Sequence, residues 1–129
     1  MAYLWVGLGS ALGGTGRFWL SGLIAQKVGE TFPWGTLVVN VSGSLVIGFL
    51  AALIAPDSRL APKFNPFVFQ FLMVGVCGGY TTFSSFSLQT LRLMQDGEWL
   101  HAGANAALSV FLCLVAVWLG FVGGQLVNR

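Results

Sequence analysis

Residues 75–87 read Gly-Val-Cys-Gly-Gly-Tyr-Thr-Thr-Phe-Ser-Ser-Phe-Ser and lie inside an apolar segment long enough to cross a bilayer. The adjacent glycines Gly78 and Gly79 lower the helix propensity of this stretch, and hydroxyl side chains crowd the residues that follow. Backbone that leaves the helix at membrane depth exposes carbonyls that lipid cannot satisfy, so it survives only where protein, an ion or a wet cavity covers it. We therefore predict a break at residues 77–82 that forms the functional centre of the chain.

The composition is that of an integral membrane protein surrounded by lipid. Of the 129 residues, 56% are hydrophobic and only 8% are charged, whereas a soluble domain carries about 25% charged residues. The net charge of +2 is small and scattered, which excludes a nucleic-acid partner. Every acidic residue falls in a predicted connection between helices, so we expect neither an enzyme nor a carrier with a carboxylate proton relay.

Four apolar segments account for nearly the whole chain and predict one all-α membrane domain over residues 1–129. We expect transmembrane helices at about residues 3–25, 33–55, 67–94 and 99–126, with the third helix broken in mid-membrane at residues 77–82. The cysteines Cys77 and Cys113 lie in apolar surroundings and are expected as free thiols.

Two polar residues inside these segments leave alternatives open. Arg17 is costly in lipid, so it either attracts anions at a vestibule or donates hydrogen bonds to carbonyls at a helix break. Asn40 belongs to a stripe of small and polar residues spaced four apart on the second segment. Its amide either lines a functional site or forms an interhelical hydrogen bond that holds the bundle together.

The basic residues near the ends of the segments show almost no bias between the two sides of the membrane. With four spans, Arg59, Lys63 and Arg129 lie on one side, while Lys27 and Arg92 lie on the other. Orientation normally follows a clear excess of Lys and Arg in the cytoplasmic connections. We hypothesise that the chain inserts in both orientations, and that two copies pair antiparallel as a homodimer whose breaks meet around a cation.

Two motifs carry a family resemblance. The stretch Pro-Trp-Gly-Thr-Leu-Val-Val-Asn at residues 33–40 and the GG-x-TTFS-x-FS pattern at residues 78–87 resemble the Fluc (CrcB-like) family of fluoride channels. Arg17, after a glycine-rich start, also fits the first helix of that family. The resemblance spans all four segments. It implies an antiparallel, dual-topology homodimer in the bacterial inner membrane, with two pores and one central structural sodium ion.

The resemblance also implies roles for individual residues. Backbone carbonyls of Gly78 and Thr81 from each subunit would hold the sodium ion, and the Asn40 amide would donate to fluoride. Phe83 and Phe86 would present the positive edges of their rings to the anion. Hydroxyl side chains would form a polar track along the pore: Thr82, Ser84, Ser87 and Ser109.

The chain departs from the family pattern on the third and fourth helices. Gln89 stands where the family commonly has Glu, and Cys113 and Val117 stand where Ser and Thr are usual. These departures concern the outer part of the polar track.

The leading hypothesis is a passive channel that lets cytoplasmic fluoride leave the cell down its electrochemical gradient. The alternative is a small dual-topology multidrug exporter, which is also four-helical but needs a membrane-embedded glutamate that residues 3–25 lack. A third reading is a helix-packing subunit without transport activity. The polar stripes and the break count against that reading.

Overall fold

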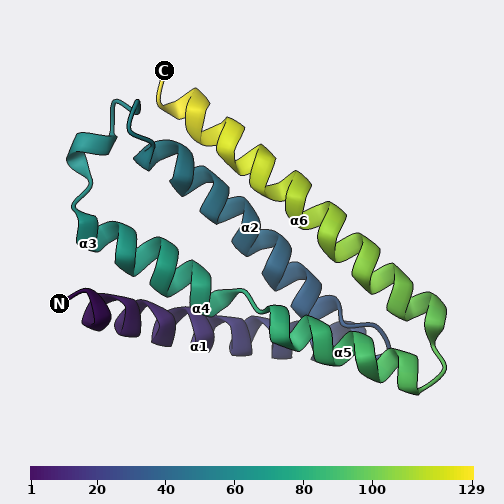
Figure 1. Cartoon of the computed structure of the whole chain (residues 1–129). Coiled ribbons are helices and arrows are strands. Elements are labelled where there is room, and N and C mark those ends of the chain that lie inside the picture. The colour runs from purple at the N-terminus through teal and green to yellow at the C-terminus, as the bar shows by residue number, and fades with distance from the viewer.

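The computed structural model describes residues 1–129 as helices joined by short connections (Figure 1). The elements are α1 (Ala2–Val28), α2 (Trp34–Ile54), the 3-10 turn η1 (Ala61–Lys63), α3 (Pro66–Phe69), the π-helix η2 (Gln70–Cys77), α4 (Gly78–Tyr80), α5 (Phe83–Gln95) and α6 (Trp99–Val127). The stretch from α3 to α5 is the predicted third segment.

The helices form two pairs. Helices α2 and α6 run side by side along most of their length, while η2 and α4 lie against α1 (Figure 1). The N-terminus, the connection between α2 and α3, and the C-terminus lie at one end of the molecule, and the other two connections lie at the opposite end. This arrangement is the one expected of a chain that crosses a membrane an even number of times.

Three helical stretches are long and apolar enough to cross a membrane: Trp34–Ile54, Pro66–Gln95 and Trp99–Val127. Helix α1 has the necessary length, with 27 residues, but its many glycines and its charged Arg17 make it less apolar. The prediction of an all-helical membrane protein is confirmed to this extent.

Glycines allow the helix backbones in both pairs to approach closely. A Cβ atom added at Gly75 in η2 would lie 2.8 Å from the Cα of Gly9 in α1. Between α2 and α6, a Cβ at Gly48 would lie 3.1 Å from the backbone nitrogen of Phe121, and Gly120 faces the backbone of Leu45 just as closely. Small residues at such positions permit the van der Waals contact that drives helix association in lipid.

The break in the third segment is shorter than predicted. Cys77 and Gly78 keep helical dihedrals, and only Thr81 (φ −81°, ψ 155°) and Thr82 (φ −150°, ψ 110°) are extended. Gly79 stays in the helix and serves packing, because a Cβ there would lie 2.8 Å from the Cα of Ser10 in α1. Helix α5 then begins at Phe83, and Thr82 is its N-cap, whose hydroxyl accepts a hydrogen bond from the Ser85 N–H at 3.2 Å.

We predict that Gly48→Ala destabilises the fold, because the added methyl group meets the backbone of α6. Overpacking of this kind costs about 1–3 kcal/mol, which thermal unfolding of the purified protein in detergent would detect. Gly103→Ala is the matched control, since nothing lies within 4 Å of a Cβ added at this other helical glycine. The control substitution is expected to be neutral or stabilising, and equal losses at both positions would contradict the packing argument.

Candidate functional site

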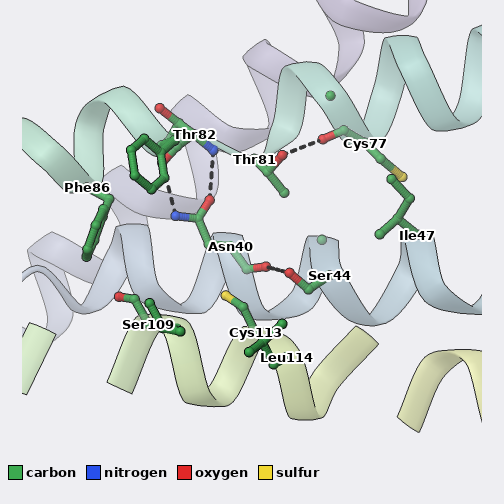
Figure 2. Close-up of a pocket in the computed structure, with 14 residues that line it drawn as sticks. Asn40, Ser44, Ile47, Cys77, Thr81, Thr82, Phe86, Ser109, Cys113 and Leu114 are labelled. Atoms are coloured by element: carbon green, nitrogen blue, oxygen red, sulfur yellow. Dashed lines mark hydrogen bonds between the residues drawn. The ribbon is translucent and has the colours of Figure 1, made fainter. Parts of the chain in front are cut away.

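An uncharged cavity of about 380 Å³ lies where the break faces α2 and α6 (Figure 2). None of its 14 lining residues is Asp, Glu, His, Lys or Arg. The structure brings seven residues predicted from the sequence into its wall: Asn40, Gly78, Thr81, Thr82, Phe83, Phe86 and Ser109. The remaining wall includes Ser44, Ile47, Cys77 and Cys113, and both cysteines are free thiols.

Asn40 in α2 holds the extended backbone of the break. Its Nδ2 donates to the Thr82 carbonyl at 3.0 Å, and the Thr82 N–H donates to its Oδ1 at 2.7 Å (Figure 2). These two bonds fix the orientation of the amide, because a flipped amide would place donor against donor and acceptor against acceptor. The interhelical hydrogen bond considered as one role for Asn40 is therefore present. One N–H of Nδ2 is left for a further acceptor.

The same pairing changes the bonding of the carbonyls before the break. In a continuous helix the Thr82 N–H would donate to the Gly78 carbonyl, but here it donates to Asn40. The extended dihedrals of Thr81 and Thr82 likewise turn the Thr81 carbonyl away from a helical donor. No side chain donates a hydrogen bond to either carbonyl, so both are available as oxygen ligands.

The two phenylalanines after the break lie next to one another. Their ring centroids are 5.4 Å apart and the ring planes meet at 49°. Phe86 is partly buried, whereas the Phe83 ring is 77% exposed on the isolated chain and is covered by no other element. One wall of the cavity is therefore open on the side of Phe83.

A chain of hydrogen bonds connects α6 to α5 behind the cavity. The Ser109 hydroxyl donates to Asn105 Oδ1 at 3.4 Å, Asn105 Nδ2 donates to the Thr90 hydroxyl at 2.9 Å, and Thr90 donates to the Phe86 carbonyl at 2.7 Å. Asn105 is only 2% exposed. The spacing of Asn105, Ser109 and Cys113 along one helix signals such a polar stripe, but only the fold identifies Thr90 as its partner.

The other two predicted track residues, Ser84 and Ser87, lie outside this cavity. Ser87 donates to the Phe83 carbonyl of its own helix at 2.9 Å, and the Ser84 hydroxyl lies 3.3 Å from that of Thr82. Both side chains are exposed on the isolated chain. They face the surface that α5 presents outward, so only a second protein chain could include them in an enclosed site.

A second, larger hollow of about 640 Å³ opens beside the connections at residues 29–33 and 96–98, and we refer to it as the vestibule. It contains Arg17 and Arg92 together with the acidic residues Glu30, Asp96 and Glu98. Arg17 Nε donates to the Gly79 carbonyl at 3.3 Å, so this side chain both lines the vestibule and binds backbone near the break. Thr82 lines both the vestibule and the cavity, so the two hollows meet at this residue.

Comparison with known proteins identifies the family. The sequence profile described as "CrcB-like protein, Camphor Resistance (CrcB)" matches residues 4–121. The chain belongs to the CrcB-like family. This membership confirms the resemblance carried by the two sequence motifs.

Several curated relatives of this CrcB-like chain share its full length. A Rhodospirillum rubrum protein is 62% identical over 130 residues, covering 100% of this chain and 98% of the relative. A Methylocella silvestris protein is 53% identical, covering 100% and 97%, and an Opitutus terrae protein is 59% identical, covering 98% and 94%. All three are named "Fluoride-specific ion channel FluC". The family is one of ion channels and not of enzymes, as the lack of a catalytic constellation in the sequence predicts.

We predict that Asn105→Leu and Thr90→Val each lower stability and that their effects are not additive, because both remove the same buried hydrogen bond. Coupling energies for such bonds between membrane helices average about 0.6 kcal/mol. A double-mutant cycle measured by unfolding in detergent tests this prediction.

The control cycle pairs Asn105→Leu with Thr15→Val. The Thr15 hydroxyl donates only to the Ala11 carbonyl of its own helix, so these two effects should add. Additivity in both cycles would contradict the role assigned to the Asn105–Thr90 bond.

Proposed function

We propose that this chain is a passive, fluoride-selective channel of the bacterial inner membrane that exports cytoplasmic fluoride. The observation that carries the proposal is the uncharged cavity at the break, which gathers neutral hydrogen-bond donors and two phenylalanine rings. The names of relatives that match almost the full chain support the same ion. Channels of this kind counter weak-acid trapping, since hydrogen fluoride enters a cell and ionises there, while the anion cannot leave through lipid.

The proposed conduction path runs through the vestibule, past Thr82 and along the cavity. The free N–H of Asn40 donates to the anion, and the Ser109 hydroxyl does so after its proton turns away from Asn105 Oδ1. The positive ring edges of Phe83 and Phe86 replace part of the water shell of the anion. Neutral donors stabilise fluoride without binding it too tightly to leave, which conduction requires. Among the acidic and basic residues of the vestibule, Arg17 offers the anion a positive charge beside the break, while its Nε stays hydrogen-bonded to the Gly79 carbonyl.

The functional unit in this proposal is an antiparallel homodimer of four-span subunits with two pores, α1 being the fourth span. The open wall beside Phe83 supports it, because a second copy is needed to cover a ring that is 77% exposed. The outward-facing Ser84 and Ser87 would then join the polar track of the assembled pore. The weak charge bias between the two ends of the molecule supports dual topology.

The proposal includes a structural sodium ion held between the breaks of two subunits. The carbonyls of Gly78 and Thr81 fit such an ion, since each has lost its helical donor and receives no side-chain donor in its place. Oxygen ligands of this kind suit a hard cation. A bound sodium ion would satisfy these two carbonyl oxygens at membrane depth, where water is not available to do so.

The alternative of a multidrug exporter has no specific support. Helix α1 contains no acidic residue that could couple export to protons, and no carboxylate lines the cavity.

We predict that purified protein in liposomes releases fluoride rapidly without a proton gradient, as measured with a fluoride electrode. Asn40→Asp is expected to abolish the flux, because a carboxylate repels fluoride and cannot donate to the Thr82 carbonyl. Phe83→Ile should lower the flux at least tenfold, because it removes the ring edge. Efflux that requires a proton gradient would contradict the channel.

Phe69→Ile is the matched control for Phe83→Ile. Phe69 is a partly exposed phenylalanine of the third segment that lines neither hollow, so its substitution should leave the flux near that of the wild type. An equal loss at both positions would show that the ring edge of Phe83 has no particular role.

We also predict that a tag on the C-terminus is accessible from both sides of the membrane in cells. Asp57→Lys combined with Asn128→Lys adds positive charge to one end only and should fix a single orientation with that end in the cytoplasm. Protease protection of the tag in intact and opened spheroplasts measures both cases. One-sided accessibility in the unmodified chain would exclude dual topology.

A further inference from the structure

Tyr80 occupies the first x of the GG-x-TTFS-x-FS motif, immediately before the extended residues. Its ring lies between two glycines from different helices. A Cβ added at Gly43 in α2 would lie 3.1 Å from Tyr80 Cδ1, and one added at Gly16 in α1 would lie 4.0 Å from Tyr80 Cδ2. The ring therefore fills the space between α1 and α2 at the level of the break.

The Tyr80 hydroxyl at the tip of this ring forms a hydrogen bond with α2. Its oxygen lies 2.9 Å from the Ser42 hydroxyl of α2. The single proton of Ser42 is donated to the Val39 carbonyl at 3.1 Å, so Tyr80 is the donor and Ser42 the acceptor. Neither residue lines the cavity or the vestibule, so this bond makes no contact with a conducted ion.

The bond completes a series of contacts along the break. Arg17 holds the Gly79 carbonyl, Ser42 holds the Tyr80 side chain, and Asn40 holds both backbone groups of Thr82. The Gly78 carbonyl comes immediately before these fixed points and the Thr81 carbonyl lies between two of them, and no side chain donates to either carbonyl. Tyr80 belongs to the short segment that connects the two carbonyls, so anchoring its ring fixes their spacing and direction.

We propose that Tyr80 and Ser42 are positioning residues for the cation site formed by the Gly78 and Thr81 carbonyls, an inference that rests on the sodium ion of the proposed function. The Tyr80–Ser42 bond preorganises the two ligands, so sodium binds without first ordering the break. Losing the bond weakens sodium binding, because part of the binding free energy is then spent on ordering that backbone.

The test is a sodium titration of the thermal unfolding temperature, with N-methylglucamine replacing sodium at constant ionic strength. The wild-type protein should be stabilised by sodium along a saturable curve. Tyr80→Phe and Ser42→Ala should each raise the sodium concentration at half-saturation about fivefold, the effect of one net hydrogen bond. The double variant should show no larger shift than either single variant, because both remove the same bond.

Tyr3→Phe is the matched control, since the other tyrosine of the chain is 92% exposed and forms no side-chain hydrogen bond. Its half-saturation concentration should equal that of the wild type. If Tyr80→Phe fails to fold, Ser42→Ala still tests the proposal, because it leaves the ring in place.

The inference is overturned if Tyr80→Phe and Ser42→Ala lower the unfolding temperature equally at every sodium concentration, since the bond would then be only structural. It is also overturned if sodium does not stabilise the wild-type protein, and the proposed cation site fails with it. Fluoride efflux is measured from liposomes made with the same preparation. Efflux that persists while either outcome above is seen would overturn the inference but leave the proposed channel function standing. Absence of efflux would instead count against the channel function itself.

Discussion

The rest of the structure depends on the need to satisfy backbone polar groups where the third segment stops being helical. Two extended residues in mid-segment leave peptide groups that hydrocarbon cannot solvate, at a cost of several kcal/mol for each unsatisfied group. Side chains from two other helices, α1 and α2, form hydrogen bonds with this backbone. Asn40 pairs with both backbone groups of Thr82, and Arg17 donates to the Gly79 carbonyl. Helices α1 and α2 must therefore lie close to the break, and their glycines make this approach possible.

The residues that hold the fold at this site are largely those to which the proposed function assigns a role in conduction. Asn40 holds the break with one N–H and retains another, and the residue lines an uncharged cavity. Arg17 combines a structural hydrogen bond with a place in the wall of the vestibule. For both residues the sequence leaves a structural and a functional role as alternatives, and the geometry is compatible with both at once.

Much of this arrangement could be predicted from the sequence, because membrane constraints are severe. The composition requires a helical membrane protein, and the GG-x-TTFS-x-FS motif locates the break to within a few residues. The position of the extended residues could not be predicted, since glycine both weakens helices and allows close packing. Gly79 allows close packing of its helix against Ser10 of α1, and only the tertiary structure shows this contact. The hydrogen-bond partners Thr82, Thr90 and Ser42 are likewise distant in sequence from Asn40, Asn105 and Tyr80.

Thr82 is the one residue that lines both the vestibule and the cavity, and this has an electrical consequence for the proposed path. Water in a vestibule carries the potential of the adjoining solution inward, so the voltage across the membrane falls mainly over the stretch that excludes water. A displaced elementary charge gains about 2.3 kcal/mol per 100 mV. An anion that moves past Thr82 on the proposed path would therefore cross whatever part of the membrane field falls between the vestibule and the cavity, and the membrane voltage would act on it there.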